Sequence, residues 1–580
     1  MSASVKRLFA GTACVALLGI GLFLLWRIRA RVEPGEEVTP WGGQAETPAR
    51  EMQSEVISTS VVRYVAGSEA WREHPAPVAL PAPSAPPQPR TKALVEKIVN
   101  GSNSVPGEWI LRFKDREAMQ EFLGSDGPHR GRVADVLLSL NSVRIVDMSA
   151  EEVSRLERET PGAFEYSPNL RVEQPRAPGK WSVTPDSGVP GAGFGPQTLA
   201  WLGIAGDHRK WGEGVSIAVL DVGVGSCPSL EGAGVVRVDM TGETQSGART
   251  ANSHGTAVAA ILSGGIPGRE GVAPSAQLIS VKVLGDNGSG DSFTLAKGIE
   301  EATARGARII NLCLGSRGDC PLVRQAVERA IAAGAIVVAA VGNDSTDGVS
   351  YPARYEGVIG VTAVDASGKR LAFANSGPEV DIAAPGLDVW AAASADTAMR
   401  MSGTSAAVPL VSGVLAYLIS GNPGLTAAEV TDVLLRNSND AGMPGRDREY
   451  GCGILNAGRI LDRGTSGIHD AAIADNCIDA ASAGDGQLTL VVSVQNRGTE
   501  ALQGADLRVM IGEFSNAVRL TDIGVGETAG CRFLVRLPGD GPTNVLRVAS
   551  DVSISGATDD NPLNNARTTV FTISGPAGQR

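Results

Sequence analysis

The chain has 580 residues, more than a single hydrophobic core usually supports, so we expect several folded parts. Its hydrophobic fraction of 43% is ordinary for globular protein. The net charge of -12 argues against a nucleic-acid partner, because phosphate binding needs clustered Lys and Arg side chains.

The first feature in chain order is an uncharged run from Leu8 to Trp26. A helix of this length spans about 28 Å, close to the hydrocarbon thickness of a bilayer. A cleaved signal peptide would show a shorter apolar stretch and small residues at a cleavage site. We therefore predict a membrane anchor or signal segment over residues 1–32. Basic residues flank both ends of the run, so the orientation stays open.

Residues 33–104 are polar and rich in proline, and they include the run PAPVALPAPSAPPQP. Such a composition buries too little apolar area to offset the entropy of ordering, which predicts an extended linker. Residues 105–175 then carry a β-α-β-β-α-β pattern, with Ser149 and Glu152 at capping-box spacing before the second helix. This order predicts a small ferredoxin-like α+β domain.

Residues 182–465 contain apolar runs of the buried-strand type, namely GVSIAVLD, QLISVKVL, ARIINLCL and AIVVAAVG. Helical stretches separate the later runs, and Gly306 and Gly334 end two of those helices. Alternating strands and helices predict an α/β fold with a doubly wound parallel sheet. Ligands of such sheets bind beyond the carboxyl ends of the strands.

The helical patterns stop near residue 470. Apolar residues then alternate with other residues in two series: Leu488, Leu490, Val492 and Val494, and Leu507, Val509 and Ile511. Period-2 alternation between Gly- and Asn-containing turns predicts an all-β sandwich over residues 470–580.

Four polar residues stand at the expected edges of the α/β sheet. Asp221 ends a strand, His254 opens a helical segment, Asn343 follows a strand and Ser405 lies at a helix start. Each segment alone is compatible with a turn or a helix cap. Together they supply what peptide hydrolysis by a serine requires: a nucleophile, a base, an acid that orients the base and an oxyanion donor.

The segments AVLDVGV, SHGTAVA, AAVGND and SGTSAAVP resemble the four signature segments of subtilisin-like serine proteases, and the similarity extends from about Gln197 to Ala457. The resemblance implies that Asp221 orients His254, that His254 is the general base and that Ser405 attacks the carbonyl. It also implies an oxyanion hole formed by Asn343 and the Ser405 amide.

The resemblance further assigns substrate-binding residues. They come from VLGDNGSGD, from INLCLGS and from the pocket floor, and they are Gly288, Ser289, Gly290, Cys313, Leu314, Gly315 and Ser350. A side chain of medium or large size and apolar character is expected in the pocket. The family needs no cofactor and often binds structural calcium, and no metal ligand is assigned here. Residues Trp109 to Val172 resemble the family's inhibitory propeptide, and the C-terminal sandwich resembles cell-adhesion-type domains.

Several positions depart from the family pattern. Val222 follows the aspartate where Thr or Ser is usual, and Val408 and Leu410 replace smaller or polar residues. Cys313 stands where Ser is usual, and either a bridge to Cys320 or a buried thiol is expected. Outside the apolar run the chain has six cysteines, an even number that suits an oxidising compartment.

These patterns together predict a serine endopeptidase that acts on polypeptides and is made as a precursor inhibited by its own propeptide. We expect the catalytic part in the cell envelope or outside the cell, tethered to the inner membrane. Cleavage between about Glu173 and Gly195 would free the catalytic and C-terminal domains from the anchor. The alternative is a catalytically weak pseudoprotease that acts as a surface-binding or adhesion protein. A lipase or esterase is disfavoured, because its G-x-S-x-G elbow and residue order are not found.

Overall fold

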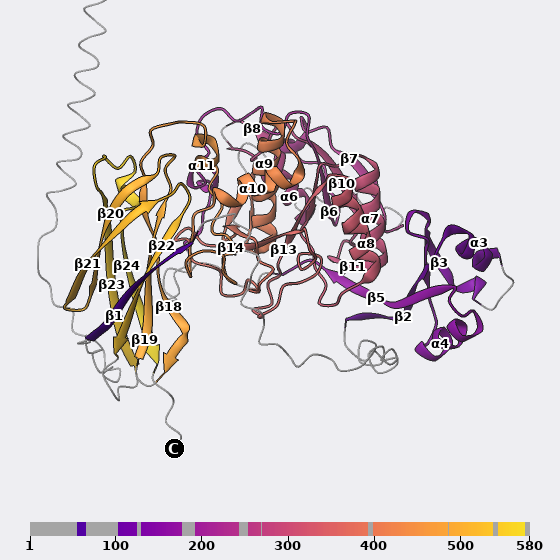
Figure 1. Ribbon diagram of the computed structural model, residues 1–580. Coiled ribbons are helices and arrows are strands. Elements are labelled where there is room, and N and C mark those ends of the chain that lie inside the picture. Colours follow the sequence, from indigo (N-terminus) through magenta and orange to yellow (C-terminus); the bar gives the residue numbers. More distant parts are fainter. Residues whose placement is uncertain are drawn as a thin grey trace, which may run out of the picture. The chain divides into compact units, whose positions relative to one another are not determined.

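The computed structural model describes residues 55–64, 103–124, 129–176, 192–242, 253–267, 269–392, 398–484, 487–536 and 543–574 (Figure 1). The predicted anchor and most of the predicted linker lie outside these residues. Residues from Glu51 to Arg580 form one compact unit.

A seven-stranded parallel sheet forms the centre of the described chain, in the order β15-β14-β13-β12-β6-β10-β7. Its strands are β6 (Ser216–Asp221), β7 (Val236–Asp239), β10 (Gln277–Lys282), β12 (Ile309–Leu312), β13 (Ile336–Ala340), β14 (Ile359–Val364) and β15 (Ile382–Pro385). Strands β7 and β10, which follow β6 in the chain, lie on one side of it, and β12 to β15 lie on the other side. The prediction of a doubly wound parallel sheet is therefore confirmed.

Helices cover both faces of this sheet, which explains why its strands are apolar throughout. In β6, Ile217 and Val219 belong to one core, whereas Ala218 and Leu220 belong to the other. The first core contains α6 (His254–Ser263) and α9 (Thr404–Gly421), and the second contains α7 (Ser292–Ala304) and α8 (Pro321–Ala332). Helices α7 and α8 lie side by side in Figure 1 and contact each other.

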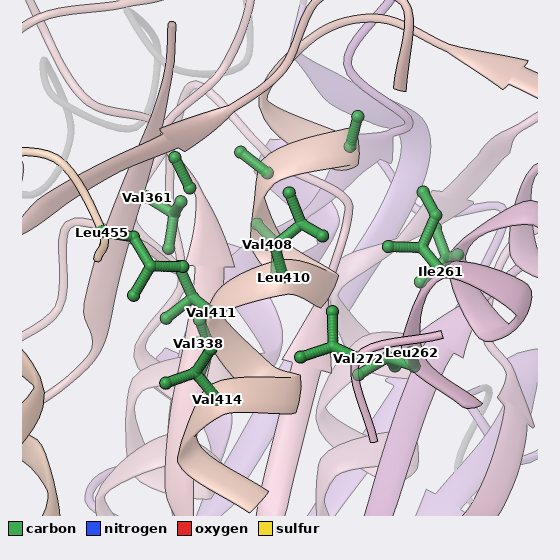
Figure 2. Close-up of a cluster of buried hydrophobic side chains, with 14 of the residues drawn as sticks. Ile261, Leu262, Val272, Val338, Val361, Val408, Leu410, Val411, Val414 and Leu455 are labelled. Atoms are coloured by element: carbon green, nitrogen blue, oxygen red, sulfur yellow. The ribbon is translucent and has the colours of Figure 1, made fainter. Parts of the chain in front are cut away.

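Helix α9 is the central helix of the first core (Figure 2). Its Val408 and Leu410, two of the departures from the family pattern, are fully buried. They pack in a cluster with side chains of α6 and of the sheet, among them Ile261, Leu262, Val338 and Val361. Among the described helices, only α9 is long and apolar enough to cross a bilayer, and most of it is buried in the protein. These departures therefore fill the core.

The central part also contains shorter helices and strand pairs. They are α5 (Thr198–Trp201), α10 (Ala427–Arg436), α11 (Ala457–Asp462), the pair β8 (Gly265–Ile266) and β9 (Arg269–Glu270), and the pair β16 (Val389–Ala392) and β17 (Ala398–Met401).

A smaller α+β unit precedes the central sheet. Its elements are β2 (Ser104–Phe113), α3 (Arg116–Gly124), β3 (Val133–Leu137), β4 (Ser142–Ile145), α4 (Ala150–Glu159) and β5 (Phe164–Glu173). The strands pair antiparallel in the order β5-β2-β4-β3. Ser149 and Glu152 form the predicted capping box at the start of α4. The β-α-β-β-α-β order is therefore confirmed.

This unit packs on the N-terminal end of α7. The buried Asn169 accepts hydrogen bonds at Oδ1 from the Ser292 hydroxyl (2.9 Å) and the Phe293 amide (3.1 Å). Arg144 forms an ion pair of 3.1 Å with Asp291, the N-cap residue of the same helix. Strand β5 pairs antiparallel with β11 (Ser289–Asp291), and this pairing extends the small sheet to five strands. The two parts thus share a sheet as well as a buried interface.

The last part of the chain forms two four-stranded antiparallel sheets around one core. Its own strands are β18 (Ala471–Gly484), β19 (Gln487–Asn496), β20 (Leu502–Ile511), β21 (Phe514–Ile523), β22 (Thr528–Arg536), β23 (Thr543–Ile554) and β24 (Ala566–Ser574). The sheet orders are β1-β22-β19-β18 and β21-β20-β23-β24. All seven apolar residues of the two predicted alternating series lie in this core, so the prediction of a sandwich is confirmed.

One strand of this sandwich comes from the N-terminal part of the chain. Strand β1 (Glu55–Tyr64) pairs antiparallel with β22 and forms the edge of its sheet (Figure 1). The sequence had placed these residues in the extended linker, and that interpretation is wrong for 55–64. The segment EVISTSVVRY is rich in β-branched residues, which favour a strand, and its backbone pairs with an edge that lies more than 450 residues away along the chain.

The loop over residues 438–447 joins the central fold to the sandwich through hydrogen bonds from its backbone amides, and it carries two buried carboxyl groups. The Asp440 amide donates to Gln495 Oε1 (3.0 Å), and Gly442 donates to Asp475 (2.9 Å). Burial raises the pKa of Asp440 to about 7 and that of Asp447 to about 7, from an ordinary value of 3.8. Both groups therefore hold their protons more tightly in the folded state than in the unfolded chain.

We predict that the contribution of Asp440 and Asp447 to stability falls as the pH rises from about 4 to about 7. These two carboxyls bind more protons in the folded state than in the unfolded chain in this window, so their contribution is complete below the unfolded pKa and lost as the pH rises through the folded pKa. Asp440→Asn should flatten the fall in the free energy of unfolding, measured by urea denaturation across the window. Equal slopes in Asp440→Asn and wild type would contradict the prediction.

Candidate active site

The four polar residues singled out in the sequence meet at the carboxyl edge of the central sheet. Asp221 is the last residue of β6, and Asn343 follows β13 after a short turn. Strand β12, next to β6, continues into Cys313, Leu314 and Gly315. The chain order of the strands reverses between β6 and β12, and ligands of doubly wound sheets bind at such a switch point.

Asp221 and His254 form a hydrogen-bonded pair. His254 Nδ1 lies 2.8 Å from Oδ2 and 3.0 Å from Oδ1 of Asp221, whose side chain is fully buried. The Val222 amide also donates to Asp221 Oδ1 (2.7 Å). A Cβ on Gly255 would lie 2.6 Å from the Gly223 carbonyl oxygen, so glycine is needed for this close approach of α6 to β6. The carboxylate therefore fixes the imidazole with Nε2 left for a further partner.

Ser405 lies in the first turn of α9, where amide groups have no partner within the helix. The residue is 2% exposed, and among the described residues its Oγ makes no hydrogen bond. The hydrogen bond from Ser405 to His254 Nε2 is thus not formed in this structure. Such bonds are often long in resting hydrolases and tighten with substrate.

The carbonyl oxygen of Ser405 lacks a hydrogen-bond donor within α9, and the Cys313 thiol supplies one. Pro409 lies inside the helix and has no N–H, so the Ser405 carbonyl lacks its usual partner four residues on. The Cys313 thiol donates to this carbonyl (3.4 Å), and Asn311 Nδ2 donates to the sulfur (3.3 Å). Burial, together with the nearby Asp221 carboxylate, raises the pKa of the Cys313 thiol well above its usual value. Cys313 is therefore a neutral donor in the core.

Of the two alternatives for Cys313, the structure contains the buried thiol. Cys313 and Cys320 are both free thiols. The bridge from Cys313 to Cys320 is therefore not formed. The side chains of Cys313 and Leu314 are fully buried in the two cores, so only their backbone faces the sheet edge.

Asn343 is oriented by Thr404 and holds a carbonyl from the preceding α+β unit. Its Oδ1 accepts from the Thr404 amide (3.1 Å) and hydroxyl (3.0 Å). Its Nδ2 therefore points away from Thr404, and it donates to the carbonyl oxygen of Pro175 (3.2 Å). A Cβ on Gly403 would lie 2.6 Å from that Nδ2, so only glycine leaves room for the amide.

The chain leading to Pro175 lies as an added strand between two segments of the central fold. The Glu173 amide donates to the Gly315 carbonyl and the Gly315 amide to the Glu173 carbonyl, each at 2.8 Å. On the other side, Ser289 to Asp291 pair with β5, and the Gln174 amide donates to the Gly288 carbonyl (2.9 Å). The predicted substrate-binding backbone of Gly288, Ser289, Gly290 and Gly315 is thus brought together around one extended segment.

A cavity of about 390 Å³ opens beside Glu173, Gln174 and Pro175. It is lined by small and polar residues of the central fold, including Gly315, Ser316, Gly342 and Ser350. Arg317 and Asp344 also line it and form an ion pair of 3.2 Å. Of the predicted pocket residues, Gly315 and Ser350 are present here.

Sequence reasoning missed several residues that position this site: Gly255, Asn311, Thr404, Ser316 and Gly342. All five lie within the quoted segments SHGTAVA, INLCLGS, AAVGND and SGTSAAVP, and this was the available signal. Among the described residues, no group of three or more His, Cys, Asp or Glu side chains is placed to hold a metal ion. The described carboxylates therefore do not provide a cluster for a structural calcium.

Comparisons with known proteins agree with this geometry. The model of the subtilase family, Peptidase S8, matches residues 212–453. A thermostable alkaline protease of Halalkalibacterium halodurans is 39% identical over 269 residues, which cover 46% of this chain and 73% of that protein. Subtilisin Savinase of Lederbergia lenta is 40% identical over 250 residues, 42% of this chain and 90% of the relative. Alkaline elastase YaB of a Bacillus strain is 32% identical over 372 residues, 63% of this chain and 94% of the relative.

The family match, these relatives and the parallel-sheet fold define a subtilisin-like serine endopeptidase. The chain belongs to the subtilase family. It acts on polypeptides, as a serine endopeptidase does.

We predict that the Cys313 thiol stabilises the backbone under Ser405. Cys313→Ala removes the donor and leaves a buried carbonyl unpaired, which costs about 1–3 kcal/mol. Cys313→Ser keeps a donor at the same place and should be the more stable variant of the two. Urea unfolding of both variants, each combined with Ser405→Ala to prevent self-digestion, measures the difference. The hydrogen bond has no structural weight if the two variants unfold at the same urea concentration.

Proposed function

We propose that Ser405, His254 and Asp221 are the catalytic triad of this endopeptidase and that Asn343 and the Ser405 amide form its oxyanion hole. The observation that carries this assignment is the Pro175 carbonyl on Asn343 Nδ2, at the end of a strand paired with Gly315 and β11. A peptide carbonyl in this place has its oxygen on an oxyanion donor at the start of the helix that carries Ser405.

The reaction then follows from the geometry. Ser405 Oγ attacks the substrate carbonyl carbon while its proton passes to His254 Nε2. Negative charge develops on the carbonyl oxygen and is stabilised by Asn343 Nδ2 and the Ser405 amide. His254 gives the proton to the leaving amine, which leaves an acyl group on Ser405, and water hydrolyses this ester by the same route. Asp221 holds the Nδ1–H tautomer throughout. No step needs a cofactor.

The alternative of a pseudoprotease that binds surfaces is not favoured. Every residue that the reaction requires is present, and the Asp-His pair and the Asn343 amide are already oriented by hydrogen bonds. We infer an active enzyme whose C-terminal sandwich is an accessory part.

We propose that the unit over residues 105–175 is an inhibitory propeptide. Its last strand fills the substrate groove, and tethering in one chain raises its effective concentration above that of free substrate. The Pro175 carbonyl on Asn343 makes the bond between Pro175 and Arg176 the proposed site of self-cleavage. Residues 182–465 would then be the catalytic domain and residues 470–580, completed by β1, the sandwich.

The cavity beside Pro175 supports a proposal for specificity. Its small residues leave space for a side chain, and the only two charged side chains of the central fold that line it neutralise each other as the pair of Arg317 and Asp344. We propose a preference for an uncharged side chain of medium or large size. The apolar run from Leu8 to Trp26 is proposed to anchor the precursor in the inner membrane, with the catalytic part in the cell envelope or outside the cell.

The triad assignment predicts that a serine-directed phosphonate labels Ser405 in the processed protein. Ser405→Ala should lose the adduct and several orders of magnitude in turnover, as measured for the equivalent change in subtilisin, a member of this family. Turnover of a peptide substrate and mass spectrometry of the adduct are the measurements. Cys313→Ser serves as the control, because it alters a neighbouring buried group and should keep the label. Turnover within about tenfold of wild type in Ser405→Ala would overturn the assignment.

Self-cleavage makes a second prediction. Wild-type protein should yield a large fragment that begins at Arg176, whereas Ser405→Ala should remain a single chain. N-terminal sequencing of both proteins checks this. If both show the same internal start, another protease makes the cut. A start at a different residue would show that the Pro175 carbonyl on Asn343 does not mark the scissile bond.

A further inference from the structure

Strand β1 lies far from the rest of the sandwich in sequence but belongs to it in space. Nine residue pairs join it to β22, from Glu55 opposite Arg536 to Tyr64 opposite Thr528. With β1 present, β22 has a neighbour on each side, β19 and β1. Without it, one side of β22 would be an open edge with unpaired amide and carbonyl groups, which proteins usually cover.

Arg63, near the end of β1, contacts the opposite sheet of the sandwich. Arg63 donates from Nη1 to the Asp522 carbonyl (3.0 Å) and from Nη2 to the Thr521 carbonyl, both in β21 of the opposite sheet. Its Nη1 also lies 3.8 Å from Glu527. Arg63 therefore joins the two sheets of the sandwich at the edge where β1 lies.

Tyr64 contacts the loop that connects the central fold to the sandwich. A Cβ on Gly445 would lie 3.0 Å from Tyr64 Cδ1, so the ring rests directly against this glycine. Likewise, a Cβ on Gly530 of β22 would lie 2.8 Å from Cγ of the neighbouring Pro444. The loop over residues 438–447 thus packs across β22 and β1 together, and β1 is held by the central fold as well as by the sandwich.

The proposed self-cleavage site lies between β1 and β22 in the chain. A cut after Pro175 places β1 on the N-terminal fragment and β22 on the C-terminal fragment, yet it breaks no contact between the two strands. An added strand bound through main-chain hydrogen bonds along an open edge is an established mode of peptide recognition.

We propose that β1 stays in the sandwich after cleavage and holds the N-terminal segment on the mature enzyme as a non-covalent subunit. The partner of the β22 edge is thus the chain's own residues 55–64. This reverses the expectation that a cut between Glu173 and Gly195 frees the catalytic and C-terminal parts from the anchor. The proposal takes its biological setting from the proposed self-cleavage, but the contacts do not depend on catalysis.

The test therefore uses a foreign protease on the full chain in detergent, with Ser405→Ala to exclude self-cleavage. One recognition site is placed between residues 80 and 90 and a second between residues 179 and 188. Cutting both separates β1 from the α+β unit as well as from the sandwich. An affinity tag at the N-terminus then captures the first fragment. We expect the large C-terminal fragment to be recovered with it after gel filtration at micromolar concentration.

Strand-breaking variants show whether the pairing is responsible. Successive residues of a strand direct their N–H groups to opposite sides, so one of Val61 and Val62 donates to β22. Val61→Pro with Val62→Pro removes that donor and should reduce recovery at least about tenfold. Val61→Thr with Val62→Thr keeps both N–H groups and the β-branched shape, and it should be recovered as the parent is.

A second measurement does not depend on the folding of a variant. A synthetic peptide of residues 53–66, added in excess to the cut parent protein, should displace the tagged fragment by competing for the β22 edge. Separation of the fragments without peptide, while circular dichroism shows the large fragment still folded, would overturn the proposal. Equal recovery of the proline and threonine variants would overturn it too. Failure of self-cleavage in wild type would refute only the proposed cleavage, because the foreign protease makes the cut here.

Discussion

Open strand edges in this protein are paired by segments from the N-terminal third of the chain. An unpaired edge leaves amide and carbonyl groups without partners, and an added strand satisfies them. Strand β5 adds to β11 and Gly315 at the groove of the central fold, and β1 adds to β22 at the edge of the sandwich.

The two pairings have different consequences because their strand ends meet different groups. Strand β5 leads to Pro175, whose carbonyl lies on the Asn343 amide at the start of α9. In the proposed assignment, this pairing presents the bond after Pro175 to Ser405. Strand β1 ends at Tyr64, whose ring packs against Gly445 of the connecting loop. The other side-chain contacts of its end are made by Arg63 with β21. The pairing of β1 is therefore structural.

Hydrogen bonds between neighbouring side chains and backbone groups orient the polar groups of the proposed site. Asp221 is fixed by the Val222 amide and in turn orients His254. Thr404 occupies Asn343 Oδ1, which directs Nδ2 to the carbonyl position. Pro409 frees the Ser405 carbonyl, and the Cys313 thiol pairs with it from below. In the proposed site, these hydrogen bonds orient the groups that a substrate would engage, and Asn343 Nδ2 already holds the Pro175 carbonyl.

Local sequence determined much of this protein. Apolar runs predicted the parallel sheet because both of its faces are buried, and period-2 series such as Leu488 to Val494 predicted the sandwich core. Residue types at strand and helix ends predicted that Asp221, His254, Asn343 and Ser405 would meet, since carboxyl ends of parallel strands share one edge. Tertiary structure alone decided the pairing of β1 with β22, the place of Pro175 on Asn343 and the role of the Cys313 thiol. Sequence patterns show which residues are buried and where elements begin, but the partner of an open edge or a freed carbonyl lies hundreds of residues away or in another layer, and only the folded chain brings it there.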